Sequence, residues 1–238
     1  TARKKQYNYY RDKLLTFDEI ETIAKEAALI GFNKIRFTGG EPLLRKNIEN
    51  IVDKVSNING INQICLTTNA TLLEQKASCL KKAGLTNLNI SLDTLIPEKY
   101  YKITGGGDIT RALLGIEEAL KHNFKLKINM VVLKNINEDE IANMQKLCCE
   151  RNIELQLIEQ FSLKETKESV CKYNRPPNCE KCNRIRLLSN GILKSCLHSE
   201  DEHKINFSNI QKSFETVIMQ KPQKGTVNSL NKMVEVGG

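Results

Sequence analysis

The sequence predicts an α/β fold in which a partial (β/α) TIM-like barrel is followed by a small C-terminal domain. The first 160 residues repeat one unit: an apolar β-rich run, a polar loop and an amphipathic helix. This alternation indicates a parallel sheet, and near-continuous apolar runs such as INMVVL suit a sheet covered on both faces. The segments TGGEP, TTN, SLD and KIN lie at or near strand ends. Such loops open on one face of a barrel, so we favour a barrel over a doubly wound sheet.

Five apolar, β-rich runs predict the strands of this barrel. They occupy residues 34–37, 63–66, 88–92, 126–133 and 154–158. The helix expected over residues 17–30 carries an apolar stripe, begins with the capping box of Thr16 with Glu19, and ends at Gly31. The same start signal recurs twice, at Thr71 with Glu74 and at Asn137 with Glu140.

A second unit follows Phe161, where the repeat stops. We expect the barrel to span residues 1–161, a polar linker to span residues 162–178, and a C-terminal domain to span residues 179–238. Within that domain, Asn190-Gly191 predicts the two-residue turn of a hairpin. Residues 210–219 predict a last helix, and the chain ends in Gly237-Gly238.

Charge and composition exclude several classes of protein. The chain has 36 Lys and Arg against 28 Asp and Glu, a net charge of +8, but the two signs are interleaved and only 5% of residues are aromatic. We therefore expect a small anionic substrate and no nucleic acid. No apolar run reaches the ~18–20 residues of a membrane helix, and the start has no signal-peptide pattern. We expect no membrane association and a cytoplasmic location, where clustered cysteines bind metal in preference to forming disulfides.

One cysteine cluster has the spacing of metal ligands. Cys179 and Cys182 form a C-x-x-C pair, and a hairpin can return Cys196 to the same point, which leaves one coordination position open. Spacing alone leaves two alternatives: an iron–sulfur cluster, or a zinc knuckle completed by His198 or Cys171. Arg184 and Arg186 alternate after the pair, so on a strand both point to one face beside the metal, where guanidinium groups suit phosphate oxygens.

A glycine-rich loop follows the first predicted strand. Gly39 and Gly40 allow the backbone to approach a ligand, and Glu41 can anchor an ammonium group, although a tight structural turn is the simpler interpretation. Asp93 in SLD could be catalytic, but a helix N-cap is the commoner role for Asp just after a strand.

Eight segments together resemble one enzyme family. They are LLTFDEI, KIRFTGGEPLLRK, LTTNATLL, LNISLDTL, KINMVVLKNIN, CEKCNRIRL with SNGILKSCL, and the terminal Gly-Gly. They are similar to the GTP 3′,8-cyclases of the radical S-adenosylmethionine superfamily. The resemblance implies conversion of GTP to (8S)-3′,8-cyclo-7,8-dihydroguanosine 5′-triphosphate, the first step of molybdopterin (molybdenum cofactor) biosynthesis. A 5′-deoxyadenosyl radical removes hydrogen from the ribose C3′, and the ribose radical attacks C8 of guanine.

The resemblance also implies the residues of the site. By matched position, S-adenosylmethionine would be contacted by Gly39, Gly40, Glu41, Pro42 and Ser91. GTP would be contacted by Arg36, Thr67, Lys127, Arg184 and Arg186. A C-terminal [4Fe-4S] cluster would be held by Cys179, Cys182 and Cys196. The implied partners are GTP, an electron donor, a downstream cyclic pyranopterin monophosphate synthase and a second copy of the chain.

Three features depart from the family pattern. The C-x-x-x-C-x-x-C motif of the radical-generating cluster, and the first barrel strand, are expected before Thr1, so the catalytic cysteines lie outside this chain. The segment 162–178 is shorter than in the family. Phe161 stands near the position of a methionine that contacts S-adenosylmethionine, and Cys171 is an added thiol.

These departures keep two alternatives open. One is a related radical enzyme with an auxiliary cluster that modifies a peptide or another small molecule. The other is a non-catalytic nucleotide- or metal-binding descendant of the enzyme.

Overall fold

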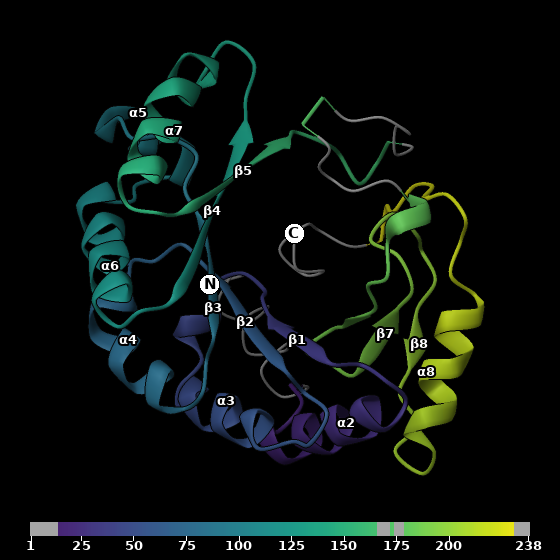
Figure 1. Ribbon diagram of the computed structural model, residues 1–238. Coiled ribbons are helices and arrows are strands. Elements are labelled where there is room, and N and C mark those ends of the chain that lie inside the picture. Colours follow the sequence, from purple (N-terminus) through teal and green to yellow (C-terminus); the bar gives the residue numbers. More distant parts are fainter. Residues whose placement is uncertain (1–13, 166–171, 174–178, 231–238) are drawn as a thin grey trace, which may run out of the picture.

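The computed structural model describes residues 14–165, 172–173 and 179–230, and its main feature is a curved parallel sheet. Five strands pair in the order β1-β2-β3-β4-β5, each parallel to its neighbour. In Figure 1 they form an open arc. The strands are β1 (Lys34–Phe37), β2 (Gln63–Thr68), β3 (Asn87–Ser91), β4 (Lys125–Val132) and β5 (Glu154–Glu159). The predicted partial barrel is confirmed.

Helices cover the convex side of this arc (Figure 1). They are α2 (Phe17–Leu29), α3 (Ile48–Ser56), α4 (Leu73–Lys82), α5 (Pro97–Thr104), α6 (Ile109–Lys121) and α7 (Ile141–Glu150). Short 3₁₀ turns, η1 (Pro42–Leu44) and η2 (Glu138–Glu140), follow β1 and β4. Alternate strand residues such as Leu66, Leu88 and Ile128 are fully buried against the helices. Burial of this apolar layer drives the fold.

The other face of the sheet is polar because side chains alternate along each strand. Strand pairing aligns these residues in rows across the concave side. One row contains Arg36 and Cys65, and the next contains Thr67, Asn89, Lys127 and Glu154. A third pairs Ser91 with Asn129. The concave side is therefore suited to a polar ligand.

The first predicted helix start is confirmed and the other two are wrong. Thr16 and Glu19 form the reciprocal capping box, and Gly31 at φ 97° follows the end of α2. The residue before α4 is Leu72, which makes no side-chain cap, and Asn137 also makes none. Asn137 and Glu140 are instead buried and bond to other segments. For Asn137 and Glu140, hydrogen bonds to segments distant in the sequence take the place of the predicted local cap.

The C-terminal region forms a small antiparallel sheet beside β1. It contains η3 (Cys179–Lys181), β6 (Arg186–Leu187), β7 (Ile192–Lys194), β8 (His203–Lys204) and α8 (Ile210–Met219). Ile23 and Ala27 of α2 pack with Phe214 and Val217 of α8 in one buried cluster. Because Ala24 of α2 belongs to the barrel core, α2 joins the two regions (Figure 1).

The predicted hairpin is present, but its turn differs from the prediction. Gly191 is left-handed at φ 84°, while Asn190 is not, and Gly191 donates its N–H to the Leu188 carbonyl at 3.0 Å. Leu188 in turn donates to Ile192 at 2.7 Å. The loop therefore has three residues and ends in a left-handed glycine, a common alternative to the two-residue turn.

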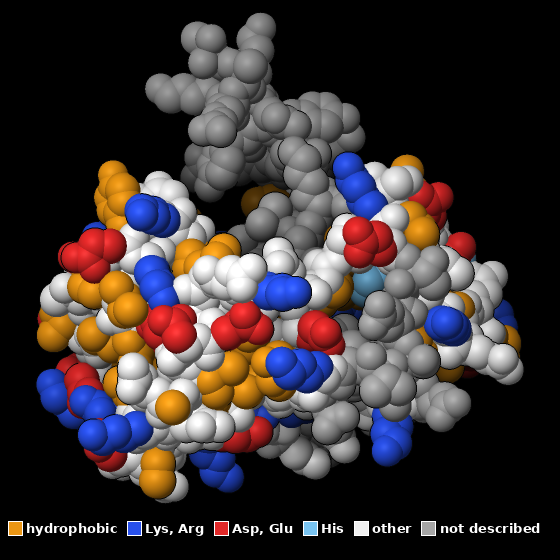
Figure 2. Space-filling model, turned by 90° about the horizontal axis from the view of Figure 1, so that it is seen from above, with side chains coloured by type: hydrophobic (Ala, Val, Ile, Leu, Met, Phe, Trp, Pro, Cys, Tyr) orange, Lys and Arg blue, Asp and Glu red, His pale blue; other side chains and the backbone are white. Residues whose placement is uncertain are grey.

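The sequence also leads us to expect interleaved charges and no membrane-spanning helix. In the described residues, acidic and basic side chains are interspersed over the face seen in Figure 2. No helix in that part of the chain is long and apolar enough to cross a membrane. Cys171 and Gly237-Gly238 lie outside the described residues, as does most of the segment 162–178.

Gly115 of α6 provides a test of how tightly the helical layer is packed. A Cβ added there would lie 2.1 Å from the Ala70 carbonyl oxygen. Helix propensity alone predicts that Gly115→Ala stabilises the protein by about 1 kcal/mol. We expect the clash to dominate and the free energy of unfolding to fall by about 1–3 kcal/mol. Urea denaturation measures the sign, and a gain in stability would contradict this packing.

Candidate functional site

The loop after β1 is held in place by the Glu41 carboxylate. Its Oε1 accepts from the Leu43 N–H at 3.0 Å and from the Thr68 hydroxyl at 2.8 Å. Its Oε2 accepts from the Asn69 N–H at 2.8 Å. Glu41 thus caps η1 and fastens the loop to the end of β2. A carboxylate has about four acceptor sites, so about one remains for a ligand.

The two glycines of this loop leave open space at the mouth of the half barrel. Gly39 has φ 149°, a conformation that favours glycine. Gly40 has no such constraint, and an added Cβ at either residue would meet no atom within 4 Å. Neither packing nor backbone conformation therefore accounts for glycine at position 40. The open space at Gly40 leaves room for a ligand to approach the backbone.

The structure brings together three of the predicted substrate residues, Arg36, Thr67 and Lys127, around Asn89. Thr67 and Lys127 are the register partners of Asn89 on β2 and β4, and these side chains share the concave face. Asn89 is 5% exposed. With its amide oxygen turned toward Arg36, Asn89 accepts from both terminal nitrogens of that guanidinium at 3.3 Å. Lys127 also forms an ion pair with Glu154 at 2.5 Å.

The end of β3 carries two of the residues singled out from the sequence. Ser91 is exposed at the carboxyl end of the strand, on the same face as Asn89. The Asp93 carboxylate accepts from the Val131 N–H at 2.7 Å, so it joins β3 to β4 and does not cap a helix. Burial raises the pKa of Asp93, partly offset by this hydrogen bond.

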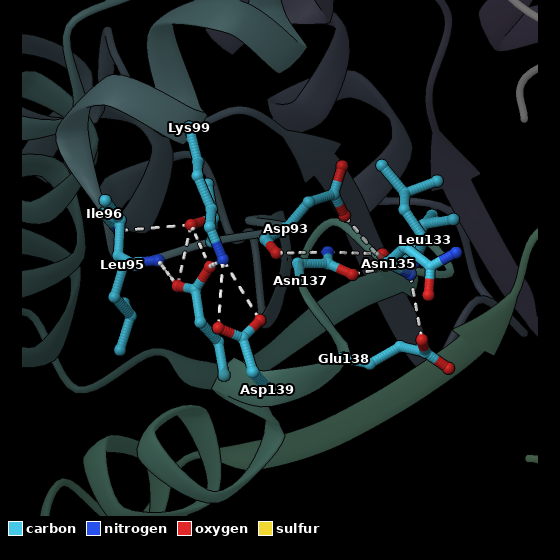
Figure 3. Close-up of polar contacts among 12 residues, drawn as sticks. Asp93, Leu95, Ile96, Lys99, Leu133, Asn135, Asn137, Glu138 and Asp139 are labelled. Atoms are coloured by element: carbon cyan, nitrogen blue, oxygen red, sulfur yellow. Dashed lines mark hydrogen bonds and ion pairs between the residues drawn. The ribbon is translucent and has the colours of Figure 1, made fainter.

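Two buried polar side chains from the loop after β4 fix the loop after β3 (Figure 3). Asn137 donates to the carbonyls of Asp93 at 2.6 Å and Val131 at 2.9 Å, and accepts from the Leu133 N–H. Glu140, 2% exposed, accepts from the Thr94 hydroxyl at 2.7 Å.

Glu140 has further partners in the same loop. It accepts from the Leu95 N–H at 2.8 Å and forms an ion pair with Lys99 at 3.0 Å. Burial opposes ionisation of Glu140, but the contacts with Leu95, Thr94 and Lys99 outweigh it and lower the pKa of this carboxyl. Asn137 and Glu140 together therefore hold the loop after β3, directly beyond Ser91.

The three cysteines lie in one region of the C-terminal sheet. The Cys182 N–H donates to the Cys179 carbonyl at 3.0 Å within the η3 turn. The Gly225 N–H donates to Cys179 Sγ at 3.3 Å, and a Cβ on Gly225 would lie 3.4 Å from Cys196 Sγ. Among the described ranges no three His, Cys, Asp or Glu side chains are gathered closely enough to enclose a metal ion.

The chemistry of these thiols nevertheless suits a metal centre. Burial disfavours the Cys182 thiolate, but a backbone hydrogen bond from Arg184 and the charges of Lys221, Arg184 and Arg186 lower its pKa overall. A lowered pKa favours the thiolate, which is the form that binds metal. The N–H aimed at Cys179 Sγ stabilises the same charge. The residues therefore fit a thiolate-bound cluster.

Arg36 of the barrel lies within electrostatic range of Arg186 in the C-terminal sheet. Arg186 is on β6, and burial lowers its pKa; Cys182 and Cys196 oppose this shift, and the Arg36 charge adds a smaller decrease. Arg184 lies just before β6. Two guanidinium groups that repel each other are stabilised by an anion between them. The barrel and the C-terminal sheet therefore each contribute positive charge to this region.

Some residues of the site were not found from the sequence. Asn89 lies two positions before Ser91, so strand alternation could have placed it on the same face. Asn137 and Glu140 were interpreted as a helix cap. Gly225 has no local signal, because its role depends on the approach of Cys179 and Cys196.

The fold and the site define a partial-barrel ligand-binding protein with a glycine-rich loop at its mouth and a thiol-bearing C-terminal module. Residues 2–148 match the Radical SAM superfamily. A GTP 3′,8-cyclase of Clostridium botulinum is 37% identical, with 83% of this chain and 75% of that protein covered. One of Clostridium perfringens is 33% identical, covering 96% and 89%. The chain therefore belongs to the GTP 3′,8-cyclase family of the radical SAM superfamily.

Solved structures show the same fold at lower identity. Native anSMEcpe with bound AdoMet superposes with a TM-score of 0.61 at 16% identity, covering 91% of this chain and 78% of that one. Streptococcus suis SuiB bound to S-adenosylmethionine gives a TM-score of 0.56 at 22% identity, covering 67% and 35%. The predicted family and fold are confirmed.

The contacts of Glu140 predict how the stability of the protein depends on pH. A carboxyl whose pKa is lowered on folding stabilises the protein above its ordinary pKa of 4.5 and loses that contribution as the pH falls through its folded value. We expect Glu140→Gln to lower the free energy of unfolding by about 1–3 kcal/mol at pH 7. The difference from the unaltered chain should shrink below pH 4.5. Denaturation across pH 3–7 measures this difference in the free energy of unfolding. Asp139→Asn is the control, because Asp139 is an exposed carboxylate that also pairs with Lys99. A difference that does not change with pH would contradict the lowered pKa of Glu140.

Proposed function

We propose that this chain carries the substrate-binding barrel and C-terminal domain of a radical SAM GTP 3′,8-cyclase. The reaction converts GTP to (8S)-3′,8-cyclo-7,8-dihydroguanosine 5′-triphosphate for molybdenum cofactor biosynthesis. The observation that carries the proposal is the placement of Arg36 on the concave face, bonded to Asn89 and within electrostatic range of Arg186. A triphosphate with several negative charges would offset both cations, and family membership identifies GTP as the nucleotide.

The polar rows of the concave face would orient the rest of GTP. Thr67 and Lys127 flank Asn89 in one row, and Asn89 fixes the Arg36 guanidinium. Arg184 would add a second guanidinium group from the C-terminal region. Because these groups come from four strands and a loop, they surround a ligand and exclude water from it.

S-adenosylmethionine would bind at the carboxyl ends of β1 and β3. Gly39 and Gly40 leave room for its close approach, Pro42 begins the η1 turn beneath it, and Ser91 is exposed nearby on β3. Glu41 keeps about one acceptor site for the amino group of the ligand. The fixed loop thus presents backbone groups to the cofactor without rearrangement.

The residues that would hold the auxiliary [4Fe-4S] cluster are Cys179, Cys182 and Cys196. Three thiolates leave one iron open, and that iron would bind the guanine. The cluster would lie beside Arg184 and Arg186, so one ligand could contact both the cluster and the guanidinium groups. An electron donor, a downstream cyclic pyranopterin monophosphate synthase and a homodimer are parts of the same proposal.

The Arg184 and Arg186 variants test the substrate. We expect Arg184→Ala and Arg186→Ala each to weaken GTP binding at least tenfold, because each removes a charge-assisted contact of about 1.5–3 kcal/mol. Lys181→Ala removes an exposed charge from the neighbouring η3 turn and should leave binding unchanged. Isothermal titration with GTP measures all three.

Turnover tests the reaction itself. The full-length polypeptide is reconstituted anaerobically with iron, sulfide, S-adenosylmethionine and a reductant, and the cyclised nucleotide is measured by chromatography and mass spectrometry. The arginine variants should lose this product, while the Lys181 variant keeps it. Cleavage of S-adenosylmethionine with no cyclised product from GTP would show that the substrate is a different molecule.

Gly40 tests the cofactor position. A Cβ at this residue meets no protein atom and the backbone conformation tolerates it, so Gly40→Ala should leave the free energy of unfolding within ~0.5 kcal/mol of the original. We expect S-adenosylmethionine binding to weaken about tenfold or more through direct contact with the added methyl group. Equilibrium dialysis measures the affinity. GTP binding is the internal control, and unaltered S-adenosylmethionine affinity would place the cofactor elsewhere.

A further inference from the structure

Lys221 joins the two segments that carry the cysteines. It lies directly after the cap residue of α8, and its ammonium group donates to the Arg184 carbonyl at 2.8 Å and to the Ser195 carbonyl at 2.6 Å. Arg184 is two residues after Cys182, and Ser195 directly precedes Cys196. The Lys221 side chain therefore links the segment after Cys182 to the segment before Cys196.

The backbone pairing of the C-terminal sheet does not make this connection by itself. The register of β6 with β7 begins at Arg186 with Lys194. The cysteine-bearing ends continue beyond that pair, where Lys221 supplies two hydrogen bonds in place of the ladder. An ammonium group has three donors, so two backbone contacts leave one donor and the whole positive charge.

The charge of Lys221 lies within electrostatic range of the thiols. Its ammonium nitrogen bonds to the carbonyl of Ser195, directly before Cys196, and to that of Arg184, two residues after Cys182. The side chain is partly buried, whereas Lys224 three residues later is exposed. A partly buried charge is screened less by solvent and acts more strongly on a neighbouring anion.

We propose that Lys221 is the positioning residue of the three-cysteine site: it fixes the Cys182 and Cys196 segments relative to each other and holds a positive charge beside them. This inference rests on the proposed cluster. A cluster gains negative charge on reduction, so the ammonium group stabilises the reduced state. Its two carbonyl contacts restrain the segments whose separation would release iron.

The two roles are separable by substitution. Lys221→Met removes the donors and the charge with little change in length, and Lys221→Arg keeps the charge and can donate to both carbonyls. Lys224→Met makes the same change of charge at a nearby exposed position. Should Lys221→Met fail to fold, Lys221→Gln keeps a donor without charge and gives the same comparison.

Each protein is reconstituted anaerobically with iron and sulfide. Iron per chain, the rate of iron loss to a chelator, and a redox titration followed by electron paramagnetic resonance are then measured. For Lys221→Met we expect iron loss about tenfold faster and a reduced-to-oxidised ratio about tenfold lower at fixed potential, a shift of about 59 mV for one electron. Lys221→Arg and Lys224→Met should stay within about twofold of the unaltered chain.

The outcomes separate this inference from the proposed function. If the unaltered chain binds no iron–sulfur cluster, the cluster assignment fails and the inference fails with it. If that chain binds a cluster and Lys221→Met matches it in iron loss and potential, only the role of Lys221 is overturned. Faster iron loss with an unchanged potential would limit Lys221 to a structural contact and overturn the electrostatic part.

Discussion

Parallel strand pairing is the constraint on which the rest of this structure depends. Because neighbouring strands run in one direction, their carboxyl ends meet at one edge of the sheet, and the loops after β1, β2 and β3 lie together there. The same register places Thr67, Asn89 and Lys127 in one row, although 60 positions separate the first from the last. Apolar alternate residues pack under the helices, so the polar ones face the concave side. One pairing rule thus determines both the core and the ligand-binding face.

The loops at that edge are fixed by polar groups that are partly buried, as Glu41 is, or fully buried, as Asn137 and Glu140 are. Glu41 fastens the loop after β1 to the end of β2, and Asn137 with Glu140 fastens the loop after β3 to the loop after β4. A buried carboxylate or amide is costly unless its partners are all in place, which makes these contacts specific. The loops are therefore set before a ligand arrives, and less conformational entropy is lost on binding.

The C-terminal sheet completes the site from the opposite side. It packs on α2 through an apolar cluster, which brings Arg186 within electrostatic range of Arg36. Arg36 and Arg186 carry like charges within electrostatic range of each other, and the pKa of the Cys182 thiol is lowered. Anionic substrate and metal centre would each relieve part of that repulsion. The fold thus brings charged groups from two regions of the chain into electrostatic range of one another.

The sequence by itself determined the alternation of strands and helices, the capping box at Thr16, the final helix, the glycine-rich loop and the cysteine spacing. These are local signals, set by periodicity, turn chemistry and short-range hydrogen bonds. Only the tertiary structure decided that Asn137 and Glu140 leave their local cap for partners more than 40 residues away, that Asn89 holds Arg36, and that Gly225 contacts the cysteines. A local pattern cannot report a partner that arrives only when the chain has folded, because burial and the loss of competing water decide which hydrogen bond is made.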